Sequence, residues 1–64
     1  MDIRISMVDG DFCEFETPLE TQDELEDFAK GVFSQKRFIT GIDQVTGTPV
    51  VLNPKYVKDI RVIR

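Results

Sequence analysis

The chain has 64 residues and a net charge of −4, from 12 acidic and 8 basic side chains. This length predicts one domain over residues 1–64 with a small core, because a domain of about 60 residues buries only about 60% of its unfolded surface. There is no histidine and one cysteine, Cys13, which excludes an intrachain disulfide, a Ser-His-Asp or Cys-His catalytic arrangement, and a zinc site of Cys and His ligands.

The first predicted element is a β-hairpin over residues 2–8 and 11–17. A two-residue loop would place apolar residues opposite charged ones. A three-residue loop, Val8-Asp9-Gly10, instead keeps the apolar residues of both strands on one face, so burial selects it. In that register Arg4 lies opposite Glu14, which is a favourable cross-strand pair.

A helix is predicted over about residues 22–34. Thr21 and Glu24 have the spacing of a capping box, in which the Thr21 hydroxyl accepts from the Glu24 amide and the Glu24 carboxylate reaches back to the Thr21 amide. Pro18 offers a rival start, but the apolar phase favours Thr21. The apolar residues then form one helical stripe at i, i+3, i+4, i+7 and i+8: Leu25, Phe28, Ala29, Val32 and Phe33.

The second half of the chain predicts three further strands, at 38–42, 50–52 and about 57–63. Asn53 is expected to cap a single helical or 3₁₀ turn between the last two strands. The resulting order is β-β-α-β-β-(short turn)-β. We therefore predict an α+β fold in which one helix packs on a mostly antiparallel sheet, and the choice between an open and a curled sheet stays open.

Alternation of side chains divides the apolar residues into a core and a remainder. The predicted core comprises the helix stripe together with Ile3, Ile5, Cys13, Phe15, Ile42, Leu52, Val57, Ile60 and Val62. The large apolar residues left outside it are Val8, Phe12, Phe38, Val51 and Ile63. If these residues cluster, they form a patch typical of an interface, whereas a curled sheet would bury them. Both alternatives are kept.

Charge is distributed unevenly along the chain. Residues 1–29 hold ten acids and one base, a net charge of −9, and residues 30–64 hold seven bases and two acids, a net charge of +5. Three interpretations compete: mutual neutralisation within the fold, a bipolar surface that steers a partner, and a basic edge that contacts phosphate. The candidate acidic face is Asp23, Glu24, Glu26 and Asp27, and the candidate basic edge is Lys55, Lys58, Arg61 and Arg64.

No residue pattern indicates catalysis, a metal or a cofactor. Cys13 falls at an inward-facing strand position beside acids, which raises a thiol pKa rather than activating the thiol. One unpaired cysteine is typical of a reducing compartment, and no stretch approaches the ~18 apolar residues of a membrane span. We therefore expect a cytoplasmic protein that is not an enzyme, binds no cofactor or metal and does not contact membranes.

The closing segment, Val50-Val51-Leu52-Asn53-Pro54-Lys55-Tyr56-Val57-Lys58-Asp59-Ile60, resembles the end of many small uncharacterised proteins of Gram-positive bacteria and their phages. In those proteins an apolar strand, an Asn-Pro turn and an Ile/Val-x-x-Ile pair finish a short chain. The resemblance implies a small accessory or regulatory protein and assigns no functional residues. The last two strands are also similar to those of Sm-like proteins, but that family places its helix before the sheet, and RNA binding is not carried over.

The sequence thus favours a small non-enzymatic protein-interaction or regulatory module. A protein partner or a second copy of the chain is the expected ligand, because small cores commonly need a partner subunit. Two alternatives belong to other classes. One is nucleic-acid binding through the basic second half, and the other is an acidic decoy that inhibits a DNA-binding protein.

Overall fold

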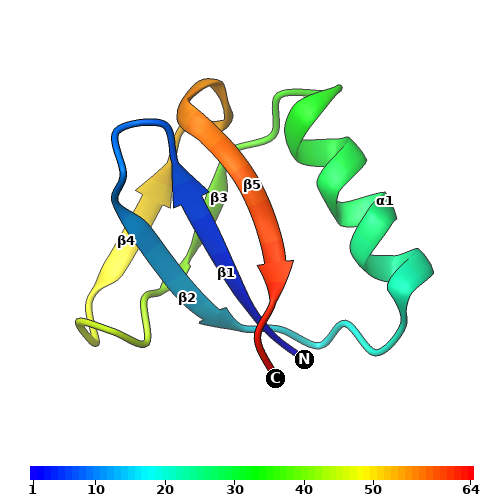
Figure 1. The fold of residues 1–64 in the computed structure, drawn as a ribbon, viewed down its shortest axis with the longest axis horizontal. Coiled ribbons are helices and arrows are strands. Elements are labelled where there is room, and N and C mark those ends of the chain that lie inside the picture. The colour runs from blue at the N-terminus through cyan, green and yellow to red at the C-terminus, as the bar shows by residue number, and fades with distance from the viewer.

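The computed structural model describes residues 1–64. The elements follow in the order β1 (Asp2–Met7), β2 (Phe12–Glu16), α1 (Gln22–Phe33), β3 (Ile39–Ile42), β4 (Pro49–Leu52), the 3₁₀ turn η1 (Pro54–Tyr56) and β5 (Val57–Val62) (Figure 1). This order and the antiparallel pairing of the strands confirm the predicted α+β class.

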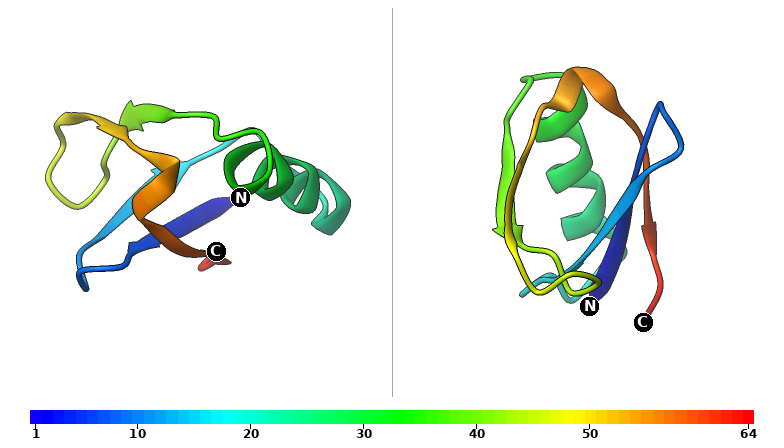
Figure 2. Two further views of the ribbon diagram at one scale, coloured as in Figure 1. Left: turned by 90° about the horizontal axis from the view of Figure 1, so that it is seen from above. Right: turned by 90° about the vertical axis from the view of Figure 1, so that its left-hand side faces the viewer.

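The strands form two sheets rather than one. A three-stranded sheet has the order β2-β1-β5, and β3 pairs with β4 in a two-stranded sheet. The two sheets face each other, and α1 closes one side of the space between them (Figure 2). They are joined at one corner, where the Gln44 amide donates to the Glu14 carbonyl oxygen at 2.8 Å and the Glu14 amide donates to Asp43 Oδ1 at 3.1 Å. The β-structure is therefore curled around its core.

The β1–β2 hairpin has the predicted register and loop. Ile3 lies opposite Phe15, and Arg4 lies opposite Glu14. The Gly10 amide donates to the Met7 carbonyl oxygen at 3.1 Å across the three-residue loop, and Gly10 has a φ of +99°. A left-handed residue at this position is the usual requirement of such a loop, and glycine adopts it without steric conflict.

The helix begins as predicted but its cap differs in one contact. Thr21 has an extended backbone, and its hydroxyl accepts from the Glu24 amide at 3.2 Å. The expected return contact to the Thr21 amide is wrong, because the Glu24 carboxylate instead accepts from the Thr21 hydroxyl at 3.3 Å. At the other end, the Ser34 amide donates to the Lys30 carbonyl oxygen at 2.8 Å, which closes the last turn.

The predicted turn between β4 and β5 is also confirmed. Asn53 Oδ1 accepts from the Lys55 amide at 3.0 Å, and Pro54 occupies the first position of η1, where its missing N–H has no partner to lose. β5 then pairs with β1, with a register shift between Ser6 and Met7.

Seven buried apolar residues form the core, contributed by both sheets and the helix: Ile3, Ile5, Phe15, Leu25, Val32, Ile39 and Val57. Cys13, Phe28, Leu52 and Ile60 are half-buried against them. The prediction that Ile42, Val62 and Phe33 belong to the core is wrong, because all three are exposed.

The error at Ile42 has a physical reason. Residues 39, 41 and 43 of this segment point inward, and Gly41 leaves room for the Phe15 ring, which would lie 3.1 Å from an added Cβ atom. Ile39 therefore takes the core position and Ile42 faces outward. Val62 is the last residue of β5, an edge strand, and Phe33 is the last residue of α1.

The two ends of the chain lie together (Figure 1). The Asp2 amide donates to the Arg64 carbonyl oxygen at 2.7 Å, and the Ile63 amide donates to the Asp2 carbonyl oxygen at 3.0 Å. The Arg64 side chain adds an ion pair, with Nε 3.1 Å from Asp2 Oδ2. Main-chain and side-chain contacts therefore hold the final residues against β1.

Candidate interaction surfaces

The thiol of Cys13 is not activated by its surroundings. Cys13 is half-buried on β2, and its pKa is raised, first by desolvation and then by the negative charge of Asp43. A raised pKa lowers the fraction of nucleophilic thiolate at neutral pH. The chain contains no group of three or more His, Cys, Asp or Glu side chains arranged to hold a metal ion.

Asp43 is a buried carboxylate with a structural role. Its Oδ1 accepts from the amides of Glu14 and Val45 at 3.1 and 3.0 Å, and its Oδ2 accepts from the Thr46 hydroxyl at 3.3 Å. These bonds, led by that of the Glu14 amide, hold the pKa of Asp43 below its ordinary value. The carboxylate thereby links the β3–β4 hairpin to β2 by a hydrogen bond and stabilises the loop that follows Asp43.

The five apolar residues that the sequence left outside the core do not form one patch. Val8 and Phe12 belong to the β1–β2 hairpin, whereas Phe38 and Val51 lie on the β3–β4 side of the molecule. The two sheets that carry these pairs form opposite walls of the fold (Figure 2). All four side chains are exposed, and Ile63 is half-buried.

A second group of exposed apolar residues emerges on the β3–β4 sheet. Thr40 pairs with Val51, and Ile42 pairs with Pro49. Because successive residues of a strand point to opposite faces, these four side chains share the face that points away from the core. We call them the β3–β4 outer face, and all four residues are exposed, with Ile42 at 56% and Val51 at 67%.

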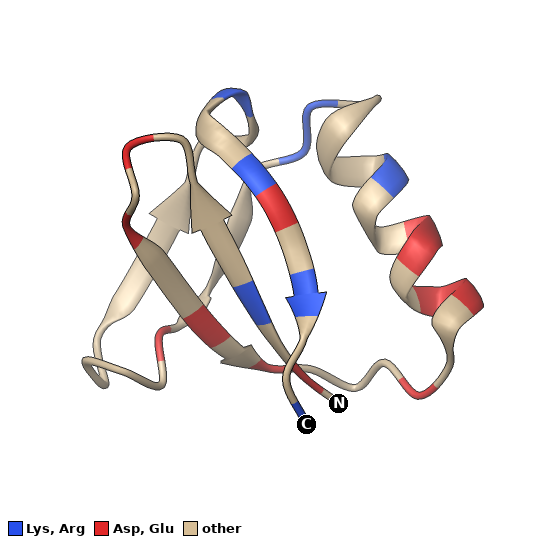
Figure 3. Ribbon diagram, viewed as in Figure 1, with Lys and Arg blue, Asp and Glu red and all other residues tan.

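This surface lies in the least charged part of the chain. Residues 38–53 contain one charged residue, Asp43, and that residue is only 4% exposed. The rest of the molecule carries the other 19 charged side chains, and β3 and β4 have none (Figure 3). Ile42 was missed because the sequence assigned it to the core, and Pro49 was missed because the predicted strand began at residue 50. The uncharged run of residues was nevertheless visible in the sequence.

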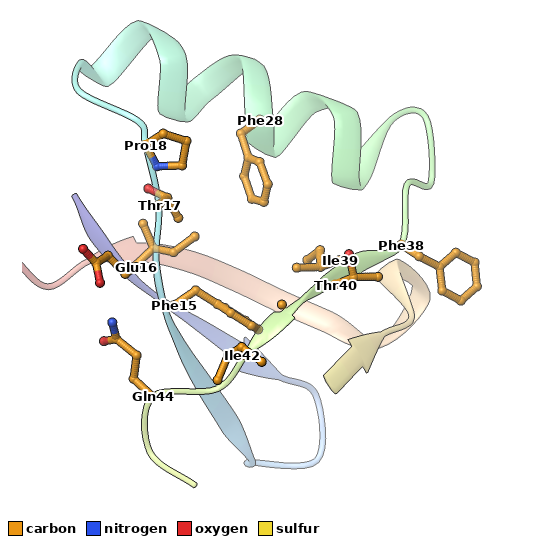
Figure 4. Close-up of a pocket in the computed structure, with 12 residues that line it drawn as sticks. Phe15, Glu16, Thr17, Pro18, Phe28, Phe38, Ile39, Thr40, Ile42 and Gln44 are labelled. Carbon is orange, nitrogen blue, oxygen red and sulfur yellow. The ribbon is translucent and has the colours of Figure 1, made fainter. Parts of the chain in front are cut away.

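A cleft of about 590 Å³ adjoins this face, between α1, the end of β2 and β3. Phe15 and Ile39 lie in it, Phe28 points into it from the helix, and Phe38 points away at its rim (Figure 4). Glu16 is the one charged residue among those that line it. Half of the lining residues are hydrophobic, and Thr17, Thr40 and Gln44 supply uncharged polar groups.

The charged residues singled out from the sequence are all at the surface. The candidate acidic face, Asp23, Glu24, Glu26 and Asp27, is exposed along the first half of α1. In the candidate basic edge, Lys55, Lys58, Arg61 and Arg64 are exposed. The two arginines form ion pairs, with Arg61 Nη2 3.4 Å from Asp59 Oδ2 and Arg64 bound to Asp2.

No protein-family model matches the chain, and no curated protein or solved structure shows significant similarity to it. None of its helices has the length and apolar character required to cross a membrane.

Proposed function

We propose that this protein is a non-enzymatic protein-interaction module that associates with a second copy of itself through the β3–β4 outer face. The observation that supports this most is the combination of exposed apolar side chains with the absence of any exposed charge over residues 38–53. Depletion of charge at the centre of a patch is what distinguishes protein interfaces from other surface.

A second copy suits this face for an electrostatic reason. Each copy carries a net charge of −4, so most relative orientations bring like charges together. Packing one β3–β4 outer face on another buries Ile42 and Val51 without placing any ionised group in the contact. The small core of seven residues also gains apolar burial in this way.

The size of the protein limits the strength of this contact. The monomer exposes 4444 Å², and a standard interface covers about 800 Å² per partner, roughly a fifth of that surface. A contact centred on the four side chains of the β3–β4 outer face lies at the lower end of this scale. The dimer is therefore expected to dissociate on dilution, in the micromolar range or above.

Sedimentation equilibrium over about 10 μM to 1 mM protein tests this proposal. The apparent mass should rise towards that of a dimer, and Val51→Asp should hold it at the monomer value, because an aspartate would be buried without a partner. Val8→Asp is the matched control: Val8 is exposed to nearly the same extent, 62% against 67%, but it lies in the loop between β1 and β2, which belong to the other sheet. A strict monomer at all concentrations contradicts the proposal, as does equal dissociation by the two variants.

The resemblance of the closing segment to short Gram-positive and phage proteins supports an accessory or regulatory role for such a module. It names no partner residue, and the test above does not depend on it.

A further inference from the structure

The basic residues of this protein divide into two groups. Three of the eight form ion pairs: Arg4 with Glu14, Arg61 with Asp59 and Arg64 with Asp2. No carboxylate lies within 4.0 Å of the other five, which are Lys30, Lys36, Arg37, Lys55 and Lys58. These five come from residues 30–38 and 53–58, and neither segment contains an acid. Their charges are therefore not neutralised by direct contacts.

The fold brings these two segments together at one end of the molecule. The C-terminal part of α1 contacts η1, and basic positions appear in η1, at the start of β5 and in the connection from α1 to β3 (Figure 3). The acidic half of α1 lies towards its other end, and Asp27, the acid nearest to the basic end, is six residues before Phe33, about 9 Å along the helix. Because charges are screened over about 8 Å at physiological salt, this end remains locally positive although the whole protein is negative.

A cleft of about 620 Å³ opens between these segments. We call it the basic cleft; its lining includes two lysines, Lys36 and Lys55, two phenylalanines, Phe33 and Phe38, and no acid. Both phenylalanines are substantially exposed, at 46% and 62%. The side chain of Lys55 also lies against Tyr56, with Nζ 5.6 Å from the ring centroid. Aromatic surface and positive charge are thus interleaved around one opening.

The backbone of Lys36 is unusual. Its φ of +55° makes it the sole residue other than glycine with a left-handed backbone in this chain. Such a position after a helix is normally taken by glycine or asparagine, since other side chains there are strained. Here it is held by a lysine at the rim of the basic cleft. Strained backbone of this kind occurs often at binding sites, and here it lies at the basic cleft.

We propose that the basic cleft binds single-stranded nucleic acid. Lys36 and Lys55 contact phosphates, and Phe33 and Phe38 offer ring faces on which unpaired bases stack. Lys30 and Lys58 extend the positive surface beyond the opening. An acidic peptide would satisfy the lysines but leave the two exposed rings unused. This site is separate from the self-association described above, and neither Ile42 nor Val51 takes part in it.

Fluorescence anisotropy with a labelled (dT)12 oligonucleotide at 20 mM salt tests the proposal, with the protein held at low concentration. We expect measurable binding that weakens as salt is raised. Phe33→Ala should reduce affinity about tenfold, the usual loss of one stacked base. The double variant Lys36→Gln/Lys55→Gln should reduce affinity further and lower the slope of log K against log salt by about 1.4, because two phosphate contacts are lost.

Arg61→Gln is the matched control, because Arg61 is an exposed base already paired with Asp59, and it should leave affinity unchanged. Circular dichroism confirms that each variant remains folded. An RNA oligomer (U12) and thymidine monophosphate are added as unlabelled competitors to distinguish binding of a strand from binding of a free nucleotide. The monophosphate should not compete. The proposal is overturned if no binding occurs at low salt, if Arg61→Gln weakens it as much as the double lysine variant, or if poly-glutamate competes while Phe33→Ala keeps full affinity.

Discussion

The two sheets of this domain share one core but differ in their outer faces. On the three-stranded sheet, Arg4 pairs with Glu14, with Nη2 2.6 Å from Oε2, and its guanidinium carbon lies 4.7 Å from the centroid of the Phe12 ring. On the two-stranded sheet, the outer positions hold Thr40, Ile42, Pro49 and Val51, none of which is charged.

The outer face of one sheet is polar and suited to contact with water, whereas the outer face of the other is largely apolar. An antiparallel sheet with one face in water normally carries polar residues there. The three-stranded sheet follows that rule except at Phe12, whose exposed ring lies against Arg4. The β3–β4 sheet departs from it, although it contributes Ile39 to the same core. Contiguous exposed apolar residues are typical of interaction surfaces, and this departure is the observation on which the proposed self-association rests.

The largest difference in stability is expected between two isoleucine-to-alanine substitutions, one on each sheet. Ile5 is fully buried, and Ile5→Ala should cost about 2–5 kcal/mol of unfolding free energy, enough to unfold much of a marginal domain. Ile42→Ala, on the exposed face, should change it by less than about 0.5 kcal/mol. Urea unfolding at low micromolar protein measures both. If the two variants lost similar amounts of unfolding free energy, Ile42 would have to contribute to the core, and the exposed face assigned to the two-stranded sheet would be contradicted.

An intermediate effect is expected at the point where the two sheets touch. A Cβ atom at Gly41 would lie 3.1 Å from the Phe15 ring, so Gly41→Ala should cost about 1 kcal/mol through overpacking. In a Phe15→Leu background the smaller side chain relieves this contact, and the substitution should cost less. A thermal-unfolding cycle over the four proteins measures the coupling. An equal cost in both backgrounds would place the strain elsewhere.

A smaller, pH-dependent effect is expected at Asp43, which links the sheets by hydrogen bonds. Its folded pKa lies below the ordinary value of 3.8, so it stabilises the fold at neutral pH, and that contribution is lost as pH falls through the folded pKa. Asp43→Asn does not titrate. Thermal unfolding between pH 7 and pH 2.5 should therefore show a smaller acid-induced loss in the variant. The same loss in both proteins would contradict this role.

Much of the fold was predictable because its signals are local. The hairpin register follows from parity around Gly10, the helix start from Thr21, and the turn before β5 from Asn53. β3 was harder, since its apolar residues occupy both parities and pattern alone does not select one. Ile39 faces inward because Gly41 admits the Phe15 ring and Asp43 bonds to β2, and both contacts join residues far apart in sequence.

The candidate surfaces were predictable in part. Four of the five apolar residues assigned to an interaction surface are exposed, but they lie on opposite walls, because which sheet a strand joins depends on long-range pairing. The imbalance of charge was visible along the chain. Which bases are neutralised was not, since the ion pair of Asp2 with Arg64 joins residues near opposite ends of the sequence.

The two termini leave the molecule side by side, at the pole opposite η1 (Figure 1). A label, an affinity tag or a solid support joined to either end therefore sits far from the basic cleft. Molecules anchored through their ends would all present that cleft outward, and two copies fused in tandem would need only a short linker to place their like poles on the same side.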